Sequence, residues 1–284
     1  MRNLLVLLAV FLVATISFAK PLSKLCPSGA CQYVVITPTS LASSFQPLVD
    51  WKTSRGVKAR IVTTEFITEH YSIGDQAKNI RQFLRDAYKT WGIRYALLGG
   101  DVELVGCRIV KTKVHEYETM PADLYFASLN GGWNGDGDDI YGEVTDGVDL
   151  DPEIFVGRAS VRNPDEVDTF VDKIMKYEKA PPRGAGKRCL WLGANLDERT
   201  FGKDVCQAII KDAKVPEFIE NKLLSTVDGN LDLETAQKAI HEFLPNIMFV
   251  AAHGGDNLIA FDGSYIQTKD AEALTNDFPF IYVA

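Results

Sequence analysis

The amino-acid sequence predicts an α/β fold in which parallel strands are covered by helices. Short β-branched and apolar segments, such as Tyr33–Thr37 and Tyr95–Leu98, alternate with segments whose apolar residues have helical spacing, such as 75–91. This strand–helix–strand order favours a parallel sheet with helices on its faces. Gly and polar residues follow the strands, and the carboxyl ends of parallel strands are where functional sites collect.

The first half of the chain contains the best-defined alternation. Its predicted helices end at turn-forming residues, as at Gly92, which follows the segment Asp75–Trp91. The predicted strands are 33–37, 58–62, 95–98 and 154–156, and the predicted helices are 39–54, 75–91 and 164–177. Residues 120–152 have a different composition, rich in Gly, Asn and Asp.

A linker at 179–187, KAPPRGAGK, divides the chain because its prolines and glycines interrupt regular structure. Beyond it, strands are predicted at 189–192, 247–251 and 280–284, and helices at 200–213, 233–243 and 268–275. We therefore expect two subdomains, 33–179 and 188–284, after an N-terminal segment at 20–32. The last residues, PFIYVA, stop inside an apolar run, so we expect a fragment whose second subdomain is incomplete.

Residues 1–19 have the pattern of a signal peptide. Arg2 precedes the apolar run Leu4–Val13, which is too short to cross a bilayer, and small residues follow it. We expect a secreted or cell-surface protein, with periplasmic transit if the source is Gram-negative, and no membrane span in the mature chain. The 284 residues include 38 acidic and 30 basic side chains with no basic stripe, so nucleic acid is not an expected partner. The sequence leaves the oligomeric state open.

The chain has five cysteines: Cys26, Cys31, Cys107, Cys189 and Cys206. In an oxidising compartment the first two could close a small disulfide loop, and two free thiols fit the sequence equally well. No Cys-x-x-Cys pair occurs, so a structural zinc site is not expected.

A histidine followed by two glycines comes directly after an apolar strand. Residues 247–251 lead through Ala252 into His253-Gly254-Gly255. At the end of a central strand, an imidazole can act as general base and acid, and the N–H of Gly254 can stabilise an oxyanion. The alternative is a buried histidine that bonds to a backbone carbonyl before a turn.

The segment 130–143, NGGWNGDGDDIYGE, alternates oxygen-bearing side chains with glycines. Asn134, Asp136 and Asp138, closed by Glu143, predict a calcium site, because calcium takes six to eight oxygen ligands. The spacing is not that of an EF-hand. Asp123 is a weaker candidate ligand, and an ordinary solvated turn is the alternative.

Several segments, in this order, resemble the gingipain family: YVVITP, LLGGDVE, PADLYFASLNGGWNGDGDDIYGE, DLDPEIFVGRASV and AAHGGDN. The resemblance implies a caspase-like three-layer αβα fold with mostly parallel sheets. It also implies a cysteine endopeptidase that acts on protein or peptide substrates through a Cys–His dyad, with His253 as the histidine and structural calcium. The nucleophile is then expected one or two places past Ala284, so this chain by itself should be inactive.

The sequence also departs from the family pattern. Arg162 stands where gingipains have a glutamate that is thought to assist the histidine, so a third catalytic carboxylate is in doubt. Asp172 falls near the acidic pocket residue of arginine-specific members, but the pattern favours a plain solvent-facing helix residue. The alternative function is a non-catalytic, secreted, calcium-binding module kept for binding or surface display. An α/β-hydrolase esterase is disfavoured, since no Gly-x-Ser-x-Gly pentad occurs.

Overall fold

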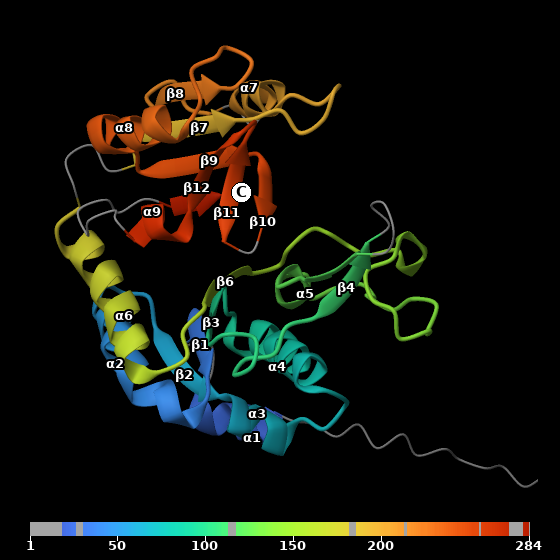
Figure 1. Cartoon of the computed structure of the whole chain (residues 1–284). Coiled ribbons are helices and arrows are strands. Elements are labelled where there is room, and N and C mark those ends of the chain that lie inside the picture. Colours follow the sequence, from blue (N-terminus) through green and yellow to red (C-terminus); the bar gives the residue numbers. More distant parts are fainter. Residues whose placement is uncertain are drawn as a thin grey trace, which may run out of the picture. The chain divides into compact units, whose positions relative to one another are not determined.

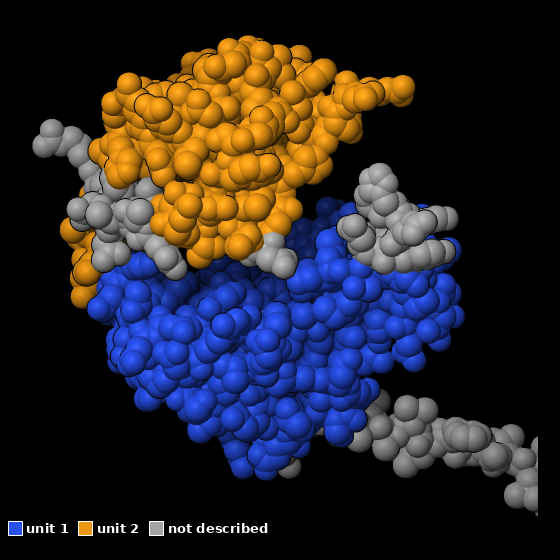
Figure 2. Space-filling model, viewed as in Figure 1, with its two compact units in different colours: residues 1–175 blue, residues 176–284 orange. Residues whose placement is uncertain are grey.

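The computed structural model describes residues 19–26, 31–112, 118–181, 186–212, 215–255, 257–272 and 281–283. The chain divides into two compact units, 1–175 and 176–284, coloured separately in Figure 2. The division falls inside helix α6 (Pro164–Lys179). Unit 1 ends 4 residues before the predicted limit at 179, and unit 2 begins 12 residues before the predicted limit at 188. Residues 1–18 of the predicted signal peptide lie outside the described residues. Within the described part, no helix is both long and apolar enough to cross a membrane.

Unit 1 is built on a parallel four-stranded sheet, as the sequence predicts (Figure 1). The strand order is β2-β1-β3-β6, and every neighbouring pair is parallel. The strands are β1 (Tyr33–Thr37), β2 (Ala59–Thr63), β3 (Tyr95–Gly99) and β6 (Phe155–Ala159).

Alternation along these strands sends successive side chains to opposite faces and creates two cores. Val35 and Leu97 pack with α2 (Thr39–Ser54) and α6 on one face. Their neighbours in the strands, among them Val34 and Leu98, pack with helices on the other face. Those helices are α1 (Ala19–Leu25), α3 (Thr64–His70) and α4 (Gln76–Trp91). Unit 1 is therefore a three-layer αβα sandwich.

Local signals define the ends of α4 as predicted. The carboxylate of Asp75 accepts from the N–H of Lys78 at the N-cap, and Gly92 ends the helix with a φ of 73°, which favours glycine. The shorter elements were not predicted, because each has too few residues to show a clear periodicity of apolar side chains. They are α1, α3, the antiparallel pair β4 (Ile109–Thr112) and β5 (Glu118–Pro121), α5 (Leu124–Ala127) and a 3-10 turn, Val144–Asp146.

Unit 2 has a second parallel sheet, with the order β13-β9-β7-β8. Helix α7 (Gly202–Asp212) covers one face, and α8 (Leu233–Phe243) packs on the other. The strands are β7 (Arg188–Gly193), β8 (Glu220–Ser225), β9 (Ile247–Ala251) and β13 (Ile281–Val283).

The chain between β9 and the predicted helix at 268–275 differs from the expected loop. It forms an antiparallel meander of β10 (His253–Gly255), β11 (Leu258–Phe261) and β12 (Ser264–Gln267). Helix α9 (Thr268–Glu272) then begins where the sequence predicts a helix. Strand β8 was not predicted either. Glycine-rich β10 and polar ENKLLS in β8 have weak strand propensity, and pairing with neighbouring strands supplies the structure instead. β11 and β12 were missed although they contain Ile, Phe and Tyr, because each has only four residues.

Candidate active site

The strand order of unit 2 defines where a ligand can bind. The chain passes from β7 to β8 on one side and then returns to β9 on the other side of β7. The loops that leave β7 and β9 therefore diverge at the carboxyl edge of the sheet, and such a switch point is the usual ligand site of an open α/β sheet. His253 follows β9 at this point, and Leu196 lies in the loop that follows β7.

His253 is held by a backbone carbonyl. Its imidazole is exposed, and Nε2 lies 2.5 Å from the carbonyl oxygen of Leu196. A carbonyl oxygen only accepts, so Nε2 is the donor and carries hydrogen. Nδ1 is then the ring nitrogen that is left to take a proton. The exposure of the side chain contradicts the alternative of a buried histidine.

The loop that carries Leu196 is fixed by its own hydrogen bonds. The N–H of Leu196 donates to the carbonyl of Thr200, and the Asp197 carboxylate accepts from the N–H groups of Arg199 and Thr200, both at 2.7 Å. The Thr200 hydroxyl also donates to Asp197. The bond from Arg199 N–H, followed by those from Thr200, lowers the pKa of Asp197, and a favourable interaction with His253 adds to the effect. Sequence reasoning missed Asp197, because its role depends on which loop meets the histidine.

Two glycines let α7 begin directly against the sheet edge. A Cβ on Gly193 would lie 2.5 Å from the backbone nitrogen of Lys203, and a Cβ on Gly202 would lie 2.5 Å from the carbonyl oxygen of Ala251. Only a residue without a side chain fits at either position. Close packing here sets the start of α7 against Ala251, the last residue of β9.

An apolar depression of about 360 Å³ lies beside His253. It is lined by Leu196, Val205, Phe249, Val250, Ala251, Ala252, His253, Gly254 and Ile259. The space over Gly254 is open: among the described residues beyond its chain neighbours, the nearest atom to an added Cβ would be the carbonyl oxygen of Leu258, at 4.0 Å. The fold itself therefore does not require glycine at 254, and a ligand can approach the backbone there.

All five cysteines lie in the described part of the chain, and none has the surroundings of a nucleophile. Burial raises the pKa of Cys189 and of Cys206 to about 11 and that of Cys31 to about 12. Burial also raises the pKa of Cys107. Cys189 pairs with Ile247 at the start of β9, at the end of the sheet away from the histidine. A catalytic thiol needs a lowered pKa, so the thiolate is not supplied by these residues.

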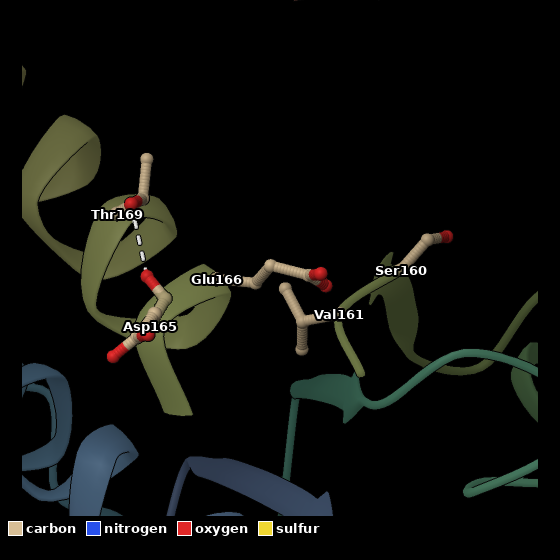
Figure 3. A pocket seen from close by; sticks show the side chains of 5 residues that line it. All are labelled: Ser160, Val161, Asp165, Glu166 and Thr169. Atoms are coloured by element: carbon tan, nitrogen blue, oxygen red, sulfur yellow. Dashed lines mark hydrogen bonds between the residues drawn. The ribbon is translucent and has the colours of Figure 1, made fainter. Parts of the chain in front are cut away.

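The carboxyl edge of the unit 1 sheet carries Arg162 and a separate depression. Arg162 forms an ion pair with Asp101 at 2.7 Å, so its guanidinium is already paired with a carboxylate. The depression, of about 380 Å³, is lined by Ser160, Val161, Asp165, Glu166 and Thr169 (Figure 3). Asp172 is exposed on α6, as expected of a solvent-facing helix residue.

The acidic loop brings three of its four predicted metal ligands together. One carboxylate oxygen from each of Asp136, Asp138 and Glu143 lies within 4.8 Å of the others. The side-chain oxygen of Asn134, the fourth predicted ligand, accepts from the N–H of Gly137 and shapes the turn. Three hard oxygen donors at this spacing suit a calcium ion.

Two acidic residues near this loop have other roles. Asp146, which sequence reasoning missed, is buried and accepts from the N–H groups of Gly135 and Glu143, so it ties the two ends of the loop together. Asp123 forms a two-point ion pair with Arg158, at 2.7 and 2.8 Å. Asp123 is therefore committed to Arg158 and is not grouped with the candidate calcium ligands.

Comparison with known proteins assigns the chain to a family. The sequence model of Peptidase family C25 matches residues 27–284. The chain belongs to Peptidase family C25. This C25 chain is 24% identical over 262 residues to gingipain R2 of Porphyromonas gingivalis (strain ATCC BAA-308 / W83), a match that covers 88% of the chain and 31% of the relative. It is also 24% identical over 262 residues to gingipain R1 of Porphyromonas gingivalis, covering 88% of the chain and 23% of that relative.

Solved structures show the same architecture. The complex of the RgpB pro- and mature domains of Porphyromonas gingivalis matches with a TM-score of 0.62 and 18% identity. The match covers 89% of the C25 chain and 54% of the chain in the solved structure. The Arg-specific cysteine proteinase gingipain R matches with a TM-score of 0.61 and 18% identity. This match covers 91% of the C25 chain and 55% of the chain in the solved structure. At 18% identity, the similarity to these solved structures shows a shared fold and nothing more. The C25 chain thus has a caspase-like αβα fold, and it spans about a third or less of the curated relatives above.

Proposed function

We propose that the protein containing this sequence is a secreted cysteine-type endopeptidase that hydrolyses peptide bonds through a Cys–His dyad. Membership of Peptidase family C25 supports cysteine-peptidase chemistry. The observation that carries the assignment to His253 is the bond from its Nε2 to the Leu196 carbonyl, at the switch point of the unit 2 sheet. That bond leaves Nδ1 to serve as the base.

The register of β13 supports a position for the thiol. β13 runs parallel to β9, with Val283 opposite Phe249. Continued in the same register, the first two positions after Ala284 come opposite Ala251 and Ala252, which line the depression beside His253. We place the nucleophilic cysteine at one of these two positions, on a continuation of β13.

In this arrangement each group has a defined task. Nδ1 of His253 takes the thiol proton, and the sulfur attacks the carbonyl carbon of the scissile bond. The oxygen that becomes negative accepts a hydrogen bond from the N–H of Gly254. The imidazolium then gives its proton to the leaving amine, and water hydrolyses the acyl-enzyme. The Leu196 carbonyl stabilises the imidazolium in the right orientation, so the dyad works without a carboxylate at position 162.

We also propose that Asp136, Asp138 and Glu143 hold a structural calcium ion. These three side chains suit a calcium ion, because their carboxylate oxygens converge and would repel one another without a cation. Calcium supplies positive charge that fixes the loop between Asn134 and Asp146. It takes no part in the peptide-bond chemistry.

The test is to sequence the gene beyond codon 284 and to express the extended chain. We expect a cysteine within two positions and a thiol-dependent peptidase activity. His253→Ala should reduce kcat by at least roughly 100-fold, as expected for loss of a general base. His241→Ala, on the surface of α8, is the matched control and should retain activity. Activity that survives His253→Ala would remove His253 from the mechanism. A serine or glycine in place of the cysteine would favour a non-catalytic binding module.

A further inference from the structure

Cys26 and Cys31 lie next to each other in the core of unit 1. Cys26 follows directly on α1, and Cys31 comes two residues before β1. Both belong to the same buried cluster, the two thiols are close enough to interact, and the Cys31 thiol donates to the carbonyl oxygen of Tyr33 at 3.3 Å. The exposed fraction is 1% for Cys26 and 0% for Cys31, so water does not reach either sulfur.

Their surroundings exclude the usual roles of reactive cysteines. Burial, strengthened by the neighbouring Cys26, raises the pKa of Cys31 to about 12, so that thiol is not a nucleophile in the folded protein. Two sulfurs are also only half of the ligand set of a tetrahedral zinc site. An adjacent, buried and unreactive pair is instead the arrangement of two half-cystines.

The helix that precedes Cys26 needs an anchor. α1 has seven residues, fewer than an isolated helix requires to be stable in water. It contributes Leu22, which is 1% exposed, to the core that also contains Phe83 and Leu84 of α4. A covalent link at the end of α1 would hold Leu22 in that core by restricting the unfolded chain.

We propose that Cys26 and Cys31 form a structural disulfide that fastens α1 to the unit 1 sheet. The two thiols lose two protons and two electrons, and an external disulfide accepts them and becomes two thiols. One cysteine first attacks the external disulfide and forms a mixed disulfide, releasing one thiol. The second cysteine then attacks its neighbour's sulfur and releases the other thiol. Because both sulfurs are buried in the folded unit, this exchange takes place before the core closes. The bond is independent of the proposed peptidase activity.

Cys189 and Cys206 form the natural comparison within the same chain. They also share a buried cluster, but Cys189 lies in β7 and Cys206 in α7, two elements that extensive packing already joins. No such short element depends on a link between them. We expect Cys189 and Cys206 to remain thiols, together with the half-buried Cys107.

The experiment uses the 284-residue chain folded with a mixture of oxidised and reduced glutathione. The folded protein is denatured without reductant, alkylated, digested and analysed by mass spectrometry. We expect alkylation of Cys107, Cys189 and Cys206 alone, and a Cys26–Cys31 peptide lighter by two hydrogen atoms. Alkylation of Cys26 and Cys31 after this treatment would overturn the proposal.

Thermal unfolding gives a second readout. Folding the wild-type chain in dithiothreitol instead of the glutathione mixture should lower its Tm by several degrees, and it should leave the Tm of the double variant Cys26→Ala/Cys31→Ala unchanged. The double variant should match the wild type folded in dithiothreitol. If the double variant does not fold, the mass measurement on the wild type still decides. Equal Tm values for wild-type chains folded with and without reductant would also contradict a structural disulfide.

Discussion

The imidazole of His253 donates its Nε2 hydrogen to the backbone carbonyl of Leu196, a residue 57 positions earlier in the chain. This single bond joins the loops that leave β7 and β9 and sets the tautomer of the ring. Because a carbonyl cannot donate, the neutral ring must carry its hydrogen on Nε2.

The first prediction concerns this tautomer. Nitrogen-15 NMR of the histidine rings should show His253 as the Nε2–H form at pH values where it is neutral. The measurement needs no nucleophile, so the 284-residue chain is sufficient. A His253→Gln variant identifies the resonance. A dominant Nδ1–H form would mean that the Leu196 carbonyl does not orient the ring.

A second prediction concerns Asp197, whose carboxylate holds the loop that carries Leu196. Asp197→Ala removes three hydrogen bonds and should speed amide exchange across residues 194–201. In the extended, active chain kcat should fall roughly tenfold with little change in KM, because the imidazole is less well positioned. Asp197→Asn, whose side-chain oxygen can still accept from the N–H groups of Arg199 and Thr200, should restore much of the loss. Asp204→Asn on the surface of α7 is the control. Unchanged exchange in Asp197→Ala would show that the carboxylate does not hold the loop.

A third prediction concerns calcium binding by the acidic loop, and the 284-residue chain is sufficient to test it. Terbium should bind at the acidic loop and emit when Trp133, three positions before Asp136, is excited, and calcium should displace it. Calcium should also raise the Tm, because a ligand that binds only the folded state stabilises it. The double variant Asp136→Asn/Asp138→Asn should lose both effects, and Asp151→Asn, an exposed residue outside the cluster, should keep them. Equal responses in the two variants would rule out this cluster as the site.

A fourth prediction contrasts two glycines of unit 2. Gly202→Ala should destabilise the chain by roughly 1–3 kcal/mol or more, since the added Cβ meets backbone atoms of Ala194 and Ala251 that cannot move aside. Gly254→Ala should leave the Tm nearly unchanged, because its Cβ enters open space. In the active extended chain, however, Gly254→Ala should lower kcat by crowding the oxyanion. Chemical denaturation measures the stability of both variants, and peptidase kinetics measure the kcat of Gly254→Ala. Equal loss of stability in the two would contradict the described packing.

A fifth prediction concerns acid stability through Asp75 and Arg108. Burial alone would raise the pKa of Asp75, but hydrogen bonds from Arg108, at 2.7 and 3.0 Å, and from the N–H of Lys78 outweigh it and lower the pKa. A lowered folded pKa means that the carboxylate stabilises the fold above its unfolded pKa of about 3.9 and that this contribution is lost as the pH falls through the folded value.

Denaturation of Asp75→Ala and of the wild type at pH 7 and pH 3 tests this assignment. The variant should be less stable at pH 7 by about 1 kcal/mol, since it also loses the N-cap of α4. The difference between the two proteins should shrink at pH 3. Asp168→Asn, on the exposed face of α6, should behave as the wild type at both pH values. A difference that grows on acidification would reverse the sign of the assignment.

Much of the fold could be predicted because its signals are local. β1 and β3 are short β-branched or apolar runs, and α4 has a cap at Asp75, an apolar stripe and a stop at Gly92. His253 was recognisable from its place after an apolar strand. The meander after β9 and the strand β8 were not. β10 is glycine-rich, β11 and β12 have only four residues each, and the largely polar β8 pairs with β7, which is more than 25 positions earlier in the chain.

The sequence by itself determined the alternation of strands and helices, the candidate histidine and the cluster of acidic residues, because each depends on neighbours within a few positions. Tertiary structure alone decided which groups meet: the Leu196 carbonyl with His253, Asp146 with both ends of the acidic loop, and Arg162 with Asp101. A backbone carbonyl has no signature in a sequence, since every residue has one. Its role depends on the order of strands in the sheet, which brings the loops after β7 and β9 to one edge.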